Sequence, residues 1–538
     1  MRAVALTSLL LLSEVVMAVE LPRTVAESSN YRSTSRYEDV MSFIAAVQRA
    51  DPEVRVEPFA TTNEGRALPL VIAGPPGIVD PRSAHATGLP IVFIMANIHA
   101  GEVEGKEAAQ MVLRDLVSSS RALRDQMIVL IAPIYNADGN EKIDSQHRPT
   151  QNGPPNGVGV RENAQGLDLN RDYMKLESPE ARGLIANVLH RWDPLLTVDL
   201  HTTNGSYHGY ALTYSPTLNP DAPQELIDFE RETLLPHIRE RMKSRHGRET
   251  YHYGNFVDQL NPEKGWYTFD SRPRFGNNYV GLRNRFTILS EAYSYIDFRA
   301  RVEVTYQFLH EILEAVTKHG RKMMKLADRA DAQLRRGKLR KLGVRFEIRP
   351  WRDAEILWER ALPAEQGAGA PDPWTEKGSI KRTGQIVPVK MTEYGIFAAT
   401  ERSSVPYAYL IDPAAKDAVR NLLLHGIVVE SLRGETTLEV AQFVIKDVER
   451  AEKAFQEHHE TTLTGKWKER RETLPAGTVL VRMNQPLARL AFYLLEPRSD
   501  DGLFDWNFFD SQLESKVAPV RKIEKPVPLE ATIITEVH

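Results

Sequence analysis

The chain has 538 residues, with 68 Lys and Arg against 72 Asp and Glu and a formal net charge of −4. At about 150 residues per domain this length predicts more than one domain, and the near balance of charge argues against a nucleic-acid partner. There is no cysteine, so disulfides and thiol nucleophiles are excluded and any metal must be held by His, Asp or Glu.

The first eighteen residues have the pattern of an export signal. Arg2 gives a positive start, Ala3–Ser13 is an apolar stretch, and Val16-Met17-Ala18 offers a small-residue cleavage site. Glu14 departs from this pattern, and a cytoplasmic protein with an apolar first helix is the alternative. We expect a signal peptide over residues 1–18 and a periplasmic or secreted mature protein. No later segment has about 18 uninterrupted apolar residues, so no membrane partner is expected after cleavage.

From about residue 30 to residue 320, short continuous apolar runs alternate with helical patterns. Continuous runs are typical of strands buried on both faces, so we predict an α/β fold with a mixed, largely parallel central sheet and helices on both faces. The clearest strands are Leu89–Ile98, Met127–Ile134, Leu195–Leu200 and Phe286–Ser290, and the clearest helices are Gly105–Val117 and Pro179–Trp192.

A second, smaller β-rich domain is predicted at the C-terminal end. A long helix begins near Arg299, and its basic stretch Arg321–Lys341 is typical of a solvated helix face or linker. We therefore expect domains over residues 19–335 and 342–538. The later strand-like segments are Val344–Ile348, Ile386–Lys390, Ile427–Glu430, Val440–Lys446 and Thr478–Val481, with a loop at Pro363–Pro373.

Aromatic residues gather near Trp506 and Phe508 in this second domain. They could form a platform for a carbohydrate or a peptide. Core packing is the commoner fate of clustered aromatic side chains, so we expect them in the core.

Three of the predicted strands end in residues that can bind a metal ion. In open α/β sheets, ligands bind beyond the carboxyl ends of the strands. The first strand is followed by His99 and Glu102, the third by His201 and the fourth by Glu291. His99 and Glu102 lie on a tight turn that Gly101 permits. With His201 they can form a His2Glu set that leaves one coordination position for water, as catalytic zinc requires.

A polar segment lies between the first and third of these strands. Its Asn170 and Arg171 suit a planar anion, because a guanidinium group binds a carboxylate through two hydrogen bonds and a neighbouring amide adds a donor. The alternative is that Arg171 only pairs with Asp168 or Asp172 at the surface.

These residues, in this order, resemble the M14 family of zinc metallocarboxypeptidases, the carboxypeptidase A-like enzymes. The resemblance rests on His99–Glu102, Asp168–Arg171, His201 and Glu291, and it spans about residues 40–320. Asn136–Gly139 is also similar to the family's Asn-Pro-Asp-Gly loop, with Ala137 in place of proline. The resemblance implies a metallocarboxypeptidase that holds one zinc ion and removes the last residue of peptides with a free C-terminal carboxylate.

The resemblance also implies a role for each metal-site residue. His99, Glu102 and His201 would hold zinc, and Asp168 would accept a hydrogen bond from a ligand imidazole and fix its tautomer. Glu291 would be the general base.

Other positions would bind the substrate. Asn170 and Arg171 would hold the terminal carboxylate, and Arg161 would polarise the scissile carbonyl. The family's lid tyrosine corresponds to either Tyr267 or Tyr279, and we favour Tyr279.

Two other functions fit the residues less well. One is a zinc-dependent deacylase of N-acyl amino acids, similar to aspartoacylase and succinylglutamate desuccinylase, whose chains are generally shorter. The other is a catalytically inactive binding module, which would be expected to lack some of the ligands or the base. A His2Glu set also holds cobalt or manganese.

Overall fold

The computed structural model describes residues 21–203, 205–364, 370–371 and 379–536. The predicted signal peptide lies outside these residues, as does most of the predicted loop Pro363–Pro373. Within the described ranges, no helix is both long enough and apolar enough to cross a membrane.

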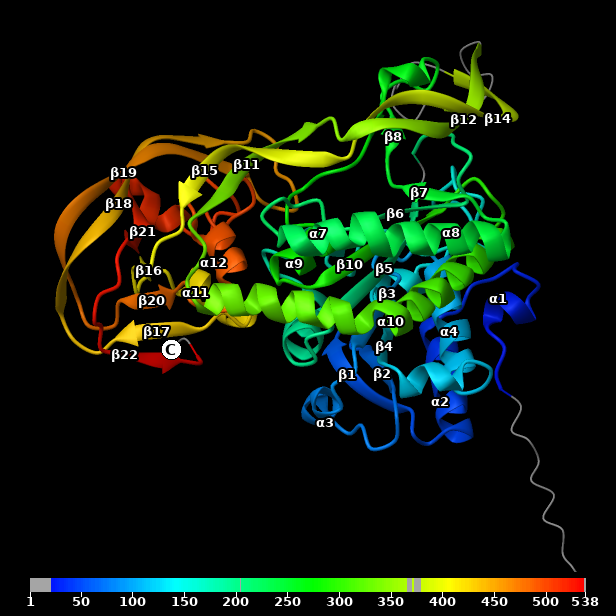
Figure 1. Ribbon diagram of the computed structural model, residues 1–538, viewed down its shortest axis with the longest axis horizontal. Helices are drawn as coiled ribbons and strands as arrows, with labels where there is room; N and C mark the ends of the chain where they lie inside the picture. The colour runs from blue at the N-terminus through cyan, green and yellow to red at the C-terminus, as the bar shows by residue number, and fades with distance from the viewer. Residues whose placement is uncertain (1–20, 204, 365–369, 372–378, 537–538) are drawn as a thin grey trace, which may run out of the picture.

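A mixed sheet forms the centre of the first part of the chain, residues 21–335, which we call the N-terminal part (Figure 1). Among the described strands its order is β1-β2-β4-β3-β5-β10-β6-β7, and the four central strands β4, β3, β5 and β10 are parallel. The bounds are β1 Arg55–Thr61, β2 Ala67–Ala73, β3 Ile91–Ala96, β4 Ile128–Ala132, β5 Leu196–Thr203, β6 Leu212–Ser215, β7 Thr250–His252 and β10 Phe286–Tyr293.

This sheet confirms the predicted fold class. Every residue of β3 and β4 is buried, which is why their sequences are continuous apolar runs rather than alternating ones. The predicted helix Gly105–Val117 is α4 (Glu104–Leu116). The predicted helix Pro179–Trp192 is divided into α6 (Pro179–Gly183) and the π-helical turn η3 (Leu184–His190).

Helices cover both faces of the sheet. On one face α4 approaches so closely that a Cβ atom on Gly105 would lie 2.7 Å from Cβ of Leu200, and Phe308 of α10 stacks on Tyr214 of β6. On the other face η3 and α9 pack over Phe93 and Thr197. The remaining bounds are α1 Val25–Ser28, α2 Tyr37–Ala50, α3 Pro81–Ala86, α5 Ala137–Glu141, α7 Gln224–Phe229, α8 Leu235–His246, α9 Gly276–Leu282 and α10 Phe298–Arg335.

The second part of the chain, residues 341–536, is rich in strands, as predicted, and we call it the C-terminal part. Its largest sheet among the described residues has the order β19-β18-β21-β16-β20-β17-β22. Trp506 is fully buried, which confirms the prediction that it belongs to a core. The bounds are β16 Ala408–Ile411, α11 Lys416–Leu424, β17 Val429–Leu432, β18 Thr436–Arg450, β19 Thr461–Leu474, β20 Val479–Arg482, α12 Ala488–Leu495, β21 Val517–Ile523 and β22 Ala531–Ile534.

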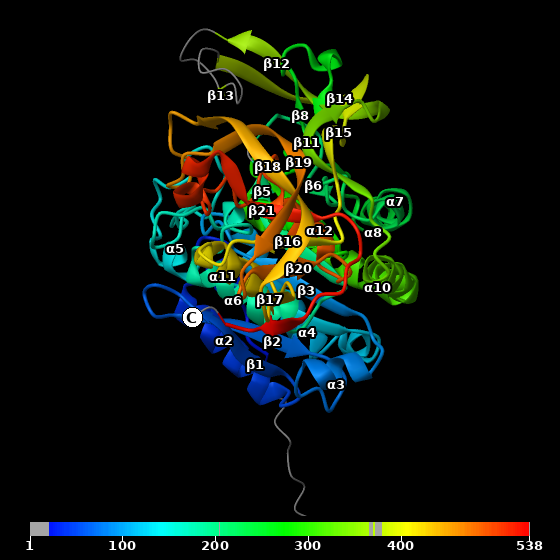
Figure 2. The same cartoon turned by 90° about the vertical axis from the view of Figure 1, so that its left-hand side faces the viewer.

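The C-terminal part begins with a long two-stranded arm that reaches the N-terminal part. It stands above the rest of the molecule in both Figure 1 and Figure 2, and its strand β14 pairs with β9 of the N-terminal part. The predicted boundary at residues 335–342 therefore has sheet pairing across it, and the division into domains stays a prediction. The bounds are β8 Asn255–Phe256, β9 Trp266–Tyr267, β11 Lys341–Arg349, β12 Arg352–Ala364, β13 Ala370–Pro371, β14 Ser379–Tyr394 and β15 Ile396–Ser404.

Candidate active site

The carboxyl ends of β3, β5 and β10 lie next to one another. Glu291 of β10 pairs in register with His201 of β5, so both side chains project from the same face of the sheet. After β3 the chain turns at Asn97, whose φ of 67° is left-handed and whose side-chain amide donates to the carbonyl oxygens of Ala100 and Glu102, each at 3.3 Å. This turn places His99 and Glu102 beside His201.

Gly101 is needed in this turn for a different reason from the one predicted. Its φ is not left-handed, so the turn does not require the backbone conformation that glycine alone adopts easily. A Cβ atom at this position would lie 2.8 Å from the carbonyl oxygen of Gly159 and 2.8 Å from Nε of Arg148. The glycine therefore provides space for the chain and the arginine that pass beside the turn.

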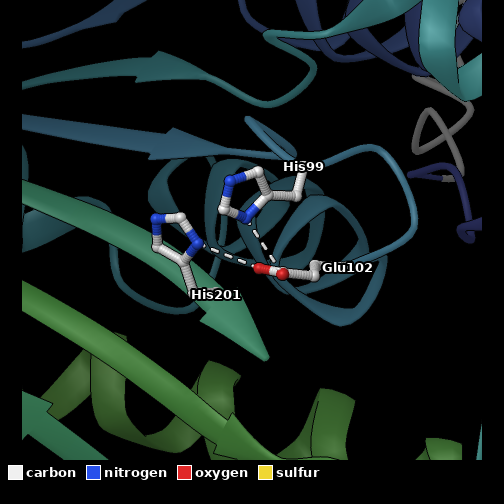
Figure 3. A group of neighbouring side chains, drawn as sticks. All are labelled: His99, Glu102 and His201. Carbon is white, nitrogen blue, oxygen red and sulfur yellow. Dashed lines mark hydrogen bonds and ion pairs between the residues drawn. The ribbon is translucent and has the colours of Figure 1, made fainter. Parts of the chain in front are cut away.

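His99, Glu102 and His201 form one buried group (Figure 3). Nδ1 of His99 lies 3.0 Å from Oε1 of Glu102, and Nδ1 of His201 lies 2.9 Å from Oε2. One donor atom from each residue lies within 4.8 Å of the others. Because zinc–ligand bonds of about 2.0–2.1 Å place neighbouring donors about 3.3 Å apart, this group fits a zinc ion.

Each imidazole of this group also touches a second carboxylate. Nε2 of His99 lies 3.0 Å from Oδ1 of Asp168, as the resemblance implied. Nε2 of His201 lies 3.0 Å from Oδ2 of the buried Asp199, a contact that was not predicted from the sequence. Although burial opposes it, Asp199 and Glu102 raise the pKa of His201 well above its usual range. A cation between the imidazoles would take the place of that proton.

Asp199 could have been found from the sequence. It lies two residues before His201 in the same strand, so both side chains lie on the same face of the sheet.

Three polar side chains lie beside the metal-site group. Arg161 donates from Nε to Oδ2 of Asp168 at 3.0 Å, Asn170 accepts a hydrogen bond from the backbone of Gly276, and the Arg171 guanidinium lies 4.0 Å from the centre of the Phe275 ring. Nη1 of Arg171 lies 4.0 Å from Oδ2 of Asp168, which is too far for a close ion pair between the two side chains.

Glu291 lies beside His201 in the sheet and lines the same cavity as the group. Burial raises the pKa of this carboxyl to about 8, His201 opposes that rise, and Glu102 and Asp199 add to it. A cation held by the neighbouring ligands would favour the ionised form of Glu291.

One cavity of about 550 Å³ joins these features. Seven of the predicted site residues line it: His99, Glu102, Arg161, Asn170, Arg171, His201 and Glu291. Arg148 and Tyr253 also line it and were not predicted. Arg148 donates to Oε1 of Glu102 at 2.7 Å. Neither Arg148 nor Tyr253 lies in a motif that marks it in the sequence.

Tyr279 was wrongly predicted to close over this cavity. Its side chain is fully buried on α9, its hydroxyl group pairs with Nδ1 of His425 at 2.8 Å, and its ring packs against Tyr173. It lies outside the cavity lining, as does Tyr267. The prediction rested on the number of residues between Tyr279 and Glu291. That spacing does not show that α9 directs the Tyr279 side chain toward the C-terminal part.

Comparisons with known proteins identify related sequences. The family model Peptidase_M14, described as zinc carboxypeptidase, matches residues 40–271. Carboxypeptidase 2 of Trichophyton equinum is 22% identical over 457 residues, which cover 82% of this chain and 77% of that protein. Carboxypeptidase 2 of Trichophyton rubrum is 22% identical over 464 residues, with the same two shares. The structure of a metallo-carboxypeptidase from Burkholderia cenocepacia aligns with 53% of this chain and 70% of its own, with 18% identity and a TM-score of 0.39.

Proposed function

Because residues 40–271 belong to the M14 family of zinc carboxypeptidases, we propose that the chain is a zinc-dependent exopeptidase that hydrolyses the last peptide bond of peptides with a free C-terminal carboxylate. The observation that carries this proposal is the cavity in which His99, Glu102 and His201 meet beside both Glu291 and Arg171. A metal site, a base and an anion-binding side chain are what this reaction needs.

His99, Glu102 and His201 would hold the zinc ion. When bound, zinc supplies Lewis acidity and favours the deprotonation of water at neutral pH. Asp168 accepts a hydrogen bond from Nε2 of His99 and so keeps Nδ1 directed toward Glu102. Asp199 lies in the corresponding place beside His201.

The remaining residues would bind the substrate and move its proton. Asn170 and Arg171 bind the terminal carboxylate, which places the last peptide bond beside the metal site. Glu291 accepts a proton from the attacking water and later gives it to the leaving amine. Arg161 donates to the carbonyl oxygen as negative charge develops on it.

The test is to incubate the purified chain with paired peptides that differ only in a free or an amidated C-terminus and to follow products by mass spectrometry. We expect the loss of single residues from the C-terminus of the free peptides only. In Arg171→Ala this activity should fall about 10- to 100-fold, since hydrogen bonds between charged groups are lost. Release of acyl groups from N-acyl amino acids without any peptide trimming would support the deacylase instead.

We also propose that the protein is exported, on the pattern of its first eighteen residues. Mass spectrometry of the mature protein from its native cells is expected to find Val19 at the N-terminus. A chain that keeps residues 1–18 would contradict export by this signal.

A further inference from the structure

The segment 168–178 has two sides with different neighbours. One side carries Asn170 and Arg171 and faces the cavity. The other side is covered by residues that follow it by more than 240 positions in the chain. The C-terminal part therefore lies directly behind the residues proposed to bind the substrate carboxylate.

The closest of these contacts comes from the turn between β18 and β19, residues 451–460, which we call the 451–460 turn. Oε1 of Gln456 accepts a hydrogen bond from the backbone N–H of Asp168 at 2.8 Å. Gln456 and Glu457 have φ values of 50° and 66°, which are left-handed and costly for these residue types. Two backbone hydrogen bonds between Phe455 and His458 hold this conformation.

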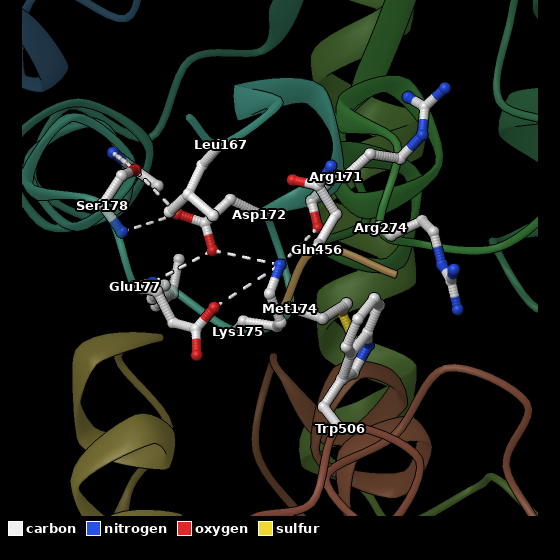
Figure 4. A network of polar contacts seen from close by, with 12 residues as sticks. Leu167, Arg171, Asp172, Met174, Lys175, Glu177, Ser178, Arg274, Gln456 and Trp506 are labelled. Atoms are coloured by element: carbon white, nitrogen blue, oxygen red, sulfur yellow. Dashed lines mark hydrogen bonds and ion pairs between the residues drawn. The ribbon is translucent and has the colours of Figure 1, made fainter. Parts of the chain in front are cut away.

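Further contacts join the segment 168–178 to the 451–460 turn and to other segments of the C-terminal part, and Figure 4 shows Lys175 beside Trp506. Nε2 of His458 lies 2.7 Å from Oε1 of Glu177. The Lys175 ammonium group lies 4.5 Å from the ring centre of Trp506. The side-chain amide of Asn421 donates to the carbonyl oxygens of Met174 and Lys175 at 3.0 and 2.9 Å.

The neighbouring part of the cavity wall is held from the same direction. Arg274 is buried and forms ion pairs with Asp501 and Glu460, each at 2.7 Å. The two residues that follow it, Phe275 and Gly276, contact Arg171 and Asn170. The segment that carries Asn170 and Arg171 and the segment that follows Arg274 therefore both depend on contacts with the C-terminal part.

We propose that Gln456 is a positioning residue for substrate binding: through the backbone of Asp168, the 451–460 turn sets the place of Asn170 and Arg171. This inference rests on the proposed exopeptidase function. It gives the C-terminal part a role in recognising the free carboxylate, although none of the residues that the structure describes there lines the cavity.

The test uses Gln456→Met in the full chain, which keeps the length of the side chain and removes the acceptor. Without it, the N–H of Asp168 loses its hydrogen bond, and KM for free-carboxylate peptides should rise about tenfold while kcat changes less than threefold. Gln456→Glu, which keeps an acceptor oxygen, should recover at least half of that loss. Lys453→Ala, at an exposed position of the same turn, should behave as the wild type.

Two further readouts separate positioning from general damage. In an Arg171→Ala background, Gln456→Met should have less than a twofold additional effect, because the group that it positions is gone. An equal additional effect in that background would overturn the inference.

Hydrogen–deuterium exchange makes the test independent of activity. Exchange in peptides that cover residues 168–178 should be about tenfold faster in Gln456→Met, with an unchanged melting temperature. Unchanged exchange would contradict the inference even if the chain is an active exopeptidase. A wild-type chain that trims no peptide would contradict the proposed function, and the exchange result would still decide whether Gln456 holds this segment.

Discussion

At the scale of single residues, the site is a set of buried charges that compensate one another. Glu102 lies between two imidazoles and accepts a hydrogen bond from Arg148, and each imidazole also contacts a second carboxylate, Asp168 or Asp199. Unpaired buried charges cost several kcal/mol, so a cation among these carboxylates is the arrangement that balances them best.

Glu291 is the residue whose replacement tests the proposed proton transfer. Glu291→Gln keeps the size of the side chain and leaves the three metal-site residues in place, so zinc content measured by elemental analysis should stay at that of the wild type. Turnover of a free-carboxylate peptide should fall about 10³-fold or more, because general acid–base and electrostatic contributions are of that order. Wild-type turnover in this variant would rule out Glu291 as the base.

The location of most site residues could be predicted from the sequence because strand ends are marked by their apolar runs. His99, His201 and Glu291 each follow such a run, and parallel strands bring their carboxyl ends together. Arg148 and Tyr253 follow no such pattern, since irregular loops place them in the cavity. Tyr279 was misplaced because sequence distance does not fix the direction of a helical side chain.

At the scale of elements, the turn after β3 couples the metal site to a neighbouring loop. Gly101→Ala would bring its new methyl group against the carbonyl oxygen of Gly159, which is backbone and cannot move aside cheaply. We expect a loss of about 1–3 kcal/mol in stability, as for other overpacked sites, together with weaker zinc binding in a chelator competition.

Gly434→Ala is the matched control for this variant. A Cβ atom at Gly434 would meet nothing within 4 Å, and its φ is not left-handed. Its effect on stability should stay within about 0.5 kcal/mol. If Gly101→Ala were equally mild in both measurements, the close approach at this turn would be unimportant.

The sequence predicted which helices and strands exist better than where each of them breaks or ends. The strand β10 and the helix α10 begin within one residue of their predicted starts. The break between α6 and η3 was not predicted, because apolar periodicity continues through it. The full length of β12 and β14 was also missed, since two long exposed strands that pair mainly with each other bury few apolar residues.

At the scale of the whole molecule, buried acids lie where the two parts meet. Asp221 of the N-terminal part accepts a hydrogen bond from the backbone of Gly343 at 3.0 Å, and Arg489 donates to its backbone carbonyl. Burial raises the pKa of Asp221 to about 7 from an ordinary value of 3.8, against the opposing effects of Gly343 and Arg489.

This shift predicts how Asp221 contributes to stability as pH changes. Between about pH 4 and pH 7 the folded chain keeps the proton on Asp221 while the unfolded chain has released it, so its contribution falls as pH rises through that window. Asp221→Asn removes this fall and keeps the acceptor for Gly343. We therefore compare the melting temperature of the variant minus that of the wild type at two pH values. This difference should be higher at pH 8 than at pH 5 by at least about 2 °C. A difference that does not depend on pH would contradict the raised pKa.

The proposed active site depends on a single cation held by three residues from two distant segments of the chain. The most direct measurement is X-ray diffraction from crystals grown with zinc, recorded above and below the zinc absorption edge. We expect one strong anomalous peak per chain within bonding distance of His99, Glu102 and His201, and its loss in His201→Ala. A catalytically active crystal with no peak among these side chains, or with its zinc bound elsewhere, would rule out a metal site formed by these three residues.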